Sequence, residues 1–495
     1  MQTRNDTIPA LFLAGLIFIV YLLLFPSAPE SMFKDPDTYW HIATGDLIRS
    51  LGALPEHDSW SFTAGNERWY NIAWAWDVAV SYIYQHDGWQ GLIAANSILI
   101  SLMLALVFAN CLIHTRDGIS AFFATLFFSA VLCNCAVRPH QVSAPCIAGL
   151  LLLLTQVHQE RISKRWLLPV PLLMVAWVNL HGGFIVAFTL LGFLSLDAAL
   201  DKRWPMVMAL AATGLAAIVA CLCNPYGIHI IDGALRTLTS KAGTTIQEWQ
   251  PFAFSLRNVT TYYLLFLLIL VRKPLPLARG EKWIAYAWLA LGLSSVRNLS
   301  MFGIVSTPLL AVALQHSVFT KPKTLPARRV LVERLAQTGT RIIHSRLAAA
   351  AIMVLGVALS IAMFTPAAGR LYGNEHFNPI PELNGEISYI EKQYPHARLL
   401  NSYDIGGPLI FLTRGAIPVW IDGRERTAYP EQLINDYIAF HKASESWADL
   451  FDYYHLDGAI IINIDRITID RFASRKGWHL AFKGKTATLF MRDKP

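Results

Sequence analysis

Ionisable and aromatic side chains gather in one short run near the N-terminus, Lys34-Asp35-Pro36-Asp37-Thr38-Tyr39-Trp40-His41. A positioned carboxylate can take a proton from the hydroxyl or amine of an acceptor. Asp35 and Asp37 are therefore the candidate catalytic residues. The candidate substrate-binding neighbours are Lys34, Tyr39, Trp40 and His41. The alternative is that the two aspartates only cap a helix starting near Thr38, because Asp is a favourable N-cap residue.

Arginine and histidine side chains stand beside several later turns. Arginine binds phosphate with two parallel hydrogen bonds. The candidates for holding a phosphate are Arg138, His140, His181, Arg297 and Asn298, and the further candidates for substrate contact are Asn179, Glu248 and Trp249. Two alternatives stay open: Arg138 could mark the aqueous boundary and snorkel, and the two histidines could be ordinary hydrogen-bonded interfacial residues.

The composition restricts the elements that can carry these side chains. Of 495 residues, 54% are hydrophobic and only 15% are charged, against roughly 25% charged in an ordinary soluble protein. The mean hydropathy is +0.40. These values exclude a purely soluble enzyme, a disordered chain and a fibrous repeat, and they favour a polytopic α-helical membrane protein. The sequence has no phosphate-binding Walker loop and no GxSxG nucleophile motif, and the net charge of +7 is attributed to membrane topology rather than to nucleic-acid binding.

Apolar runs predict about eleven transmembrane helices. They cover residues 8–26, 89–113, 118–136, 142–157, 166–180, 183–200, 205–223, 259–271, 283–296, 299–316 and 347–365. Lys and Arg are more frequent in the loops on the side of the N-terminus, which predicts a cytoplasmic N-terminus. With an odd number of crossings, the acidic motif, the candidate cationic turns and residues 366–495 all lie outside the cytoplasm. We expect the polar motifs to meet there in one site.

Two domains are predicted. Residues 1–365 form the transmembrane domain, whose first exterior loop, 27–88, is rich in Trp and Tyr and includes an expected amphipathic helix over 72–85. Residues 366–495 form a small exterior α/β domain. The predicted strands are 398–401, 417–421, 458–463 and a hairpin over 478–492, and the predicted helices are 382–394, 431–442 and 446–454.

The run Asp35-Pro36-Asp37-Thr38-Tyr39-Trp40-His41-Ile42-Ala43-Thr44-Gly45, directly after the first span, resembles the GT-C superfamily of integral membrane glycosyltransferases. Further stretches are similar to those of uncharacterised bacterial members. They are Trp177-Val178-Asn179-Leu180-His181-Gly182-Gly183, Arg297-Asn298, Asn401-Ser402-Tyr403-Asp404-Ile405-Gly406-Gly407 and Ile421-Asp422-Gly423-Arg424.

The resemblance implies a sugar donor linked to polyprenyl phosphate, an acceptor that is a glycan, a lipid or a protein, and a bacterial inner membrane as the location. It implies that Asp37, or else Asp35, is the general base of an inverting transfer, and that Arg138, His140, His181 and Arg297 hold the donor phosphate. No cofactor is certain, because some members need a divalent metal and others do not; Glu248 is the candidate for a second acidic motif. In the exterior domain, Asp422-Gly423-Arg424-Glu425-Arg426 would either cover the membrane site or form a structural turn with paired charges.

Two other classes of function compete with the glycosyltransferase. A lipid or polysaccharide transporter or flippase would place its ionisable groups near the membrane midplane on broken helices, whereas the polar motifs of this chain stand at the ends of the predicted spans. A non-catalytic envelope assembly protein would use the acidic pair structurally and the α/β domain to bind a partner.

Overall fold

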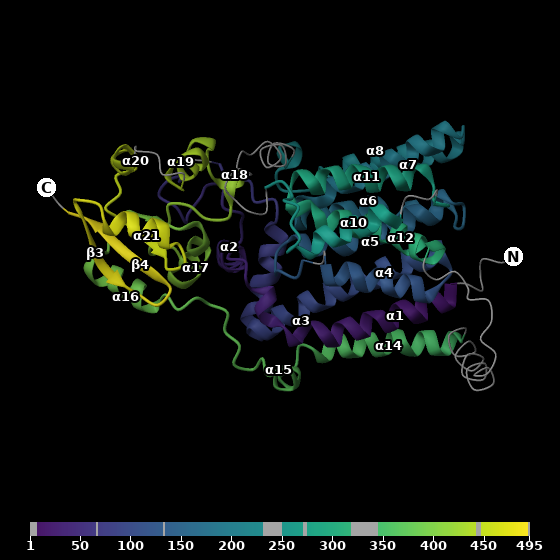
Figure 1. The fold of residues 1–495 in the computed structure, drawn as a ribbon, viewed down its shortest axis with the longest axis horizontal. Coiled ribbons are helices and arrows are strands. Elements are labelled where there is room, and N and C mark those ends of the chain that lie inside the picture. The colour runs from purple at the N-terminus through teal and green to yellow at the C-terminus, as the bar shows by residue number, and fades with distance from the viewer. Residues whose placement is uncertain are drawn as a thin grey trace.

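A computed structural model describes residues 7–65, 68–131, 134–230, 250–270, 275–317, 345–441 and 447–493. Long helices lie side by side in one bundle, and the mixed α/β region lies at one end of it (Figure 1). The helices of the bundle are α1 (Thr7–Leu24), α3 (Trp74–Thr115), α4 (Gly118–Val131), α5 (His140–His158), α6 (Val170–Leu180), α7 (Ile185–Leu200), α8 (Trp204–Ala220), α10 (Val259–Leu270), α11 (Arg279–Ser294), α12 (Leu299–Ser317) and α14 (Arg346–Ala362).

Each of the apolar segments predicted from the sequence coincides with one of these helices. In the part of the chain that the structure describes, five helical segments are long and apolar enough to cross a membrane, and a sixth results if α14 and α15 (Pro366–Tyr372), bent by 90°, count as one span. The protein is therefore a helical, multi-pass membrane protein with five or six candidate spans. The count of eleven crossings stays a prediction.

The first exterior segment contains two helices before the bundle continues. Helix α2 (Asp37–Leu51) packs against α3. The helix expected over 72–85 is present as the first part of α3, which changes direction at Gly88, where φ is 58° and ψ is −149°. That backbone conformation is open to glycine because it has no Cβ. The break separates the arm that packs on α2 from the apolar part of α3.

The C-terminal region is built on a four-stranded sheet of order β1-β2-β4-β3. Strand β1 (Leu399–Asn401) is parallel to β2 (Gly458–Ile462), and β4 (Ala487–Arg492) is antiparallel to both β2 and β3 (Trp478–Lys483). The helices around the sheet are α16 (Asn384–Gln393), α17 (Tyr403–Thr413), α18 (Glu425–Ala428), α19 (Glu431–His441), α20 (Trp447–Tyr453) and α21 (Arg466–Ala473). Of these, α17, α18 and α21 fall outside the helices predicted from the sequence.

The strand predicted over 417–421 does not join the sheet in the described structure. Val419 instead forms an isolated parallel bridge with Ser61 of the first exterior loop. The neighbouring backbone N–H groups, those of Trp420 and Ile421, donate hydrogen bonds to the side-chain Oδ1 of Asn401. A side chain thus replaces the strand that would have paired there.

The first exterior loop and the C-terminal region share one hydrophobic core. Trp60 and Trp69 of the loop pack in the same cluster as Leu400, Trp420 and Phe490. Trp69 and Trp420 are at most 1% exposed. The C-terminal region is therefore closed by the loop between the first spans, and the boundary at residue 366 stays a prediction.

Candidate active site

The acidic motif forms an ion-pair centre with Arg138 at the start of α2. The Arg138 guanidinium contacts Asp35 Oδ2 at 2.8 Å and Asp37 Oδ2 at 2.6 Å. Asp35 Oδ1 also accepts a hydrogen bond from the Asp37 backbone N–H at 3.0 Å, and Asp37 Oδ1 accepts one from Trp40 Nε1 at 3.1 Å. Asp35 therefore satisfies one backbone donor at the helix start, but α2 begins at Asp37 with Pro36 as its N-cap residue and has no side-chain cap, so the capping alternative is wrong in this form. Both carboxylates bind the same arginine instead.

The C-terminal region lies directly on this centre. A Cβ added to Gly423 would stand only 1.6 Å from Asp37 Oδ1, and one added to Gly407 of α17 would stand 2.3 Å from the Pro36 carbonyl oxygen. Both positions admit glycine alone at these distances. Asp37 is consequently only 4% exposed, and the turn around Gly423 covers it.

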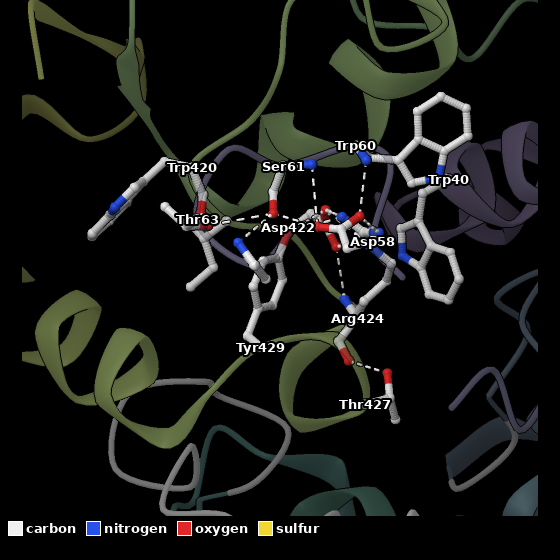
Figure 2. Close-up of polar contacts among 12 residues, drawn as sticks. Trp40, Asp58, Trp60, Ser61, Thr63, Trp420, Asp422, Arg424, Thr427 and Tyr429 are labelled. Atoms are coloured by element: carbon white, nitrogen blue, oxygen red, sulfur yellow. Dashed lines mark hydrogen bonds and ion pairs between the residues drawn. The ribbon is translucent and has the colours of Figure 1, made fainter. Parts of the chain in front are cut away.

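The same turn is held by a buried charge cluster that links the C-terminal region to the loop after α2 (Figure 2). The guanidinium of Arg424 contacts Asp422 Oδ2 at 2.6 Å and also contacts Asp58 of the first exterior loop, and all three side chains are fully buried. Tyr429 donates a hydrogen bond to Asp422 Oδ2 at 2.7 Å. The cluster fixes Gly423 against Asp37, so the turn both covers the site and forms a structural ion cluster.

A histidine lies one helical turn after Asp37. His41 Nδ1 is 2.5 Å from Asp77 Oδ1 of α3, and the other Asp77 oxygen accepts a hydrogen bond from Asn71 Nδ2 at 2.7 Å. Burial and the guanidinium of Arg138 lower the pKa of His41 well below its usual value. The contact between His41 and Asp77 ties α2 to α3.

Four of the predicted phosphate-binding residues are close enough for their charges to interact; they are Arg138, His140, His181 and Arg297. Burial lowers the pKa of His181 well below its usual value, and the charges of His140, Arg297, Arg138 and His41 act in the same direction. His181 Nδ1 is 2.6 Å from Ser143 Oγ. His140 has a buried Nε2 with no hydrogen-bond partner among the described residues. A buried polar atom without a partner is costly, so a ligand group at His140 would be favoured.

Other predicted residues have mainly structural contacts. Tyr39 donates a hydrogen bond to the Pro379 carbonyl at 2.6 Å. The amide of Asn179 accepts from Trp74 Nε1 and donates to the carbonyls of Val175 and Cys223, and Asn298 Nδ2 donates to the Leu291 carbonyl. Lys34 is exposed. Glu248 and Trp249 lie outside the described residues.

No protein-family model matches the chain, and no curated protein matches it. Among solved structures, the fold is similar to that of the oligosaccharyltransferase of Archaeoglobus fulgidus in the apo form, a GT-C membrane glycosyltransferase, with a TM-score of 0.52 and 14% identity. The match covers 93% of this chain and 70% of that chain. The chain has a GT-C-like fold. The resemblance first based on the acidic motif is therefore supported at the level of the fold.

The resemblance noted in the sequence left the use of a metal open. Across the residues that the structure places, no group of three or more His, Cys, Asp and Glu side chains is arranged to hold an ion. Asp35 and Asp37, which would be the nearest ligands, are both bound to Arg138. Because Arg138 occupies both carboxylates, Asp35 and Asp37 do not fit a metal site.

The structure also places beside the acidic centre residues that the sequence did not single out as part of the site. Asp77 lies inside a predicted amphipathic helix, where one acidic residue is unremarkable, and Asp58 lies in a loop rich in polar residues. Gly407 belongs to a Gly-Gly pair, and such a pair can indicate that another part of the backbone approaches closely. Their partners are far away in sequence, so spacing alone could not assign them.

Proposed function

We propose that this protein is a membrane glycosyltransferase that moves a sugar from a polyprenyl-phosphate donor to an extracytoplasmic acceptor. The fold supports the class. The observation that carries the proposal is the Arg138 guanidinium shared by Asp35 and Asp37, next to His140 with its buried, unpartnered Nε2 among the described residues. An arginine fork and a neighbouring ring nitrogen suit a phosphate, and the carboxylates suit proton transfer.

In the proposed reaction, the donor phosphate competes with the carboxylates for Arg138. When Arg138 turns to the phosphate, Asp37 loses its neutralising partner and becomes a better proton acceptor. The acceptor oxygen or nitrogen then bonds to the anomeric carbon, the bond from that carbon to the phosphate oxygen breaks, and the acceptor proton goes to Asp37. The single displacement inverts the configuration at the anomeric carbon. Polyprenyl phosphate is the leaving group, and Arg138 binds its phosphate with the help of Arg297, His140 and His181.

We also propose that the N-terminus is cytoplasmic and that the C-terminal region is periplasmic in a bacterial inner membrane. The C-terminal region and the N-terminal end lie at opposite ends of the bundle (Figure 1), as an odd number of crossings requires. Lys and Arg in the predicted cytoplasmic loops support the same orientation.

Asp37→Asn is expected to reduce sugar transfer by about 100-fold or more, because positioned proton transfer contributes 10²–10⁴-fold in enzymes. The amide retains the size of the side chain and a hydrogen-bond acceptor for Trp40. Transfer is measured as sugar released from a purified polyprenyl-phosphate sugar in the presence of membrane extract of the host, and the unfolding temperature is measured in parallel.

The matched control for Asp37→Asn is Asp46→Asn on the same helix, whose carboxylate accepts from Ser81 and Gln85 outside the centre. It should transfer sugar at the wild-type rate. Normal turnover by Asp37→Asn would remove Asp37 from the mechanism. Normal function in cells of a double Asp35→Ala and Asp37→Ala variant would favour the non-catalytic assembly protein instead.

Arg138→Lys is expected to weaken binding of undecaprenyl phosphate by about 10–100-fold. Lysine keeps the positive charge beside Asp35 and Asp37 but loses the two-pronged geometry, and a charge-assisted hydrogen bond contributes about 1.5–3 kcal/mol. Binding is measured by the shift of the unfolding temperature across a lipid titration. Equal affinity in the variant and the wild type would exclude Arg138 as the phosphate ligand.

A further inference from the structure

A second polar group lies inside the bundle, at the far end of α3 from Asp77. His114 Nε2 of α3 is 2.9 Å from Glu281 Oε1 of α11, and the two side chains are 5% and 6% exposed. His114 Nδ1 is 2.8 Å from the backbone oxygen of Asn110. Because a carbonyl oxygen can only accept, Nδ1 carries a hydrogen, and the Nε2–Oε1 contact holds one further proton between ring and carboxyl.

The Glu281 carboxylate is fixed from other directions as well. Gln159 Nε2 donates to Oε1 at 3.3 Å, and the Ala278 backbone N–H donates to Oε2 at 3.1 Å. Glu281 therefore has a defined position between α3, α5 and α11. A buried ionisable pair in a membrane bundle is rare and is retained where it serves a site.

Two neighbouring polar atoms line a small cavity beside this pair. Asn110 Oδ1 is buried and has no hydrogen-bond partner in the described part of the chain. Thr155 Oγ1 is also buried, and the Glu281 carboxyl group is its polar neighbour; the two residues are 2% and 1% exposed. His114, Glu281 and apolar residues such as Leu151 and Val305 line the same cavity. Leaving the Asn110 oxygen unsatisfied costs about 1–3 kcal/mol in proteins.

We propose that this cavity is a binding site for an ordered water molecule that bridges Asn110 Oδ1 and Thr155 Oγ1. The cavity leaves room for about one water molecule. The chemistry is complementary: the amide oxygen needs a donor, the Thr155 hydroxyl can donate or accept, and water does both. The site lies apart from the acidic centre and does not depend on the proposed glycosyl transfer.

The test is the size of the stability change in Thr155→Val relative to a control, measured by thermal unfolding of the full-length protein in micelles. If water binds, the substitution removes one of its partners, and the unfolding temperature falls by about 1–3 °C more than in the control. A dry cavity gives no such excess, because valine then removes only the contact of the hydroxyl with Glu281. The control is Thr125→Val in α4, a residue equally buried whose hydroxyl donates to the Ala121 carbonyl.

A decrease for Thr155→Val larger than that for Thr125→Val supports the water site. An increase above the wild type, or the same change as the control, overturns it. A density map of the wild-type protein decides independently, including the case in which Thr155→Val does not fold. The proposal requires a density peak within hydrogen-bond distance of both Asn110 Oδ1 and Thr155 Oγ1, and a map with ordered water elsewhere but no peak there refutes it.

Discussion

Gly423→Ala is expected to abolish sugar transfer while leaving the helical bundle folded. The new Cβ would stand 1.6 Å from Asp37 Oδ1, far inside van der Waals contact. Asp37 cannot yield without breaking its contacts with Arg138 and Trp40, and Gly423 cannot yield without disturbing the buried Arg424 cluster. Either response displaces the carboxylate from its place, and a misplacement of about 1 Å can cost 100-fold in rate.

The measurement combines the transfer assay with limited proteolysis of the C-terminal region, which reports whether the turn still sits on α2. The control is Gly192→Ala in α7, where an added Cβ meets no atom within 4 Å, and its activity should match the wild type. If Gly423→Ala transfers sugar normally and resists protease like the wild type, the turn does not rest on Asp37 in the working protein.

Arg424→Leu is expected to destabilise the exterior part by about 3–5 kcal/mol. It leaves the fully buried Asp58 and Asp422 carboxylates facing each other without a counter-charge, and breaking one side of a buried ion pair has costs of this size. The loss should be visible as an early unfolding transition followed by tryptophan fluorescence, because Trp69 and Trp420 belong to the shared core.

The matched control is Arg492→Leu, which breaks an exposed pair with Asp452 in the same region and should cost less than about 1 kcal/mol. Adding Asp58→Asn and Asp422→Asn to Arg424→Leu removes both stranded charges and should restore part of the stability. No early transition in Arg424→Leu, or no recovery in the triple variant, would contradict the buried-charge account.

Local patterns in the sequence were enough for the helices of the bundle and for the contact between Arg138 and the acidic motif. Apolar runs of membrane length have one favourable backbone conformation in lipid, so each predicted segment coincides with a helix. The meeting of Arg138 with Asp35 followed from their shared side of the predicted topology. The hairpin over residues 478–492 was predictable from two alternating runs around a Gly-containing turn.

Long-range partners could not be predicted in the same way. His41 pairs with Asp77, and Arg424 pairs with Asp58. The partners are far apart in sequence, and no periodic pattern of residues indicates that they meet. The strand predicted over 417–421 is an example. Its residues have high β propensity, but two of their backbone N–H groups donate to the side chain of Asn401 instead of to another strand. Asn179 and Asn298 are candidate ligand contacts from the sequence. In the structure, their side-chain amides donate hydrogen bonds to backbone carbonyl groups at helix ends.

The core shared between the first exterior loop and the C-terminal region has a consequence for biosynthesis. Trp60 and Trp69 leave the ribosome hundreds of residues before Leu400, Trp420 and Phe490, their packing partners. Until the C-terminal region has been made, these two indoles lack their packing partners. A chain that stops before that region would contain Asp35, Asp37 and Arg138 but lack the turn around Gly423 that covers Asp37, so the acidic centre is completed only by residues made late in synthesis.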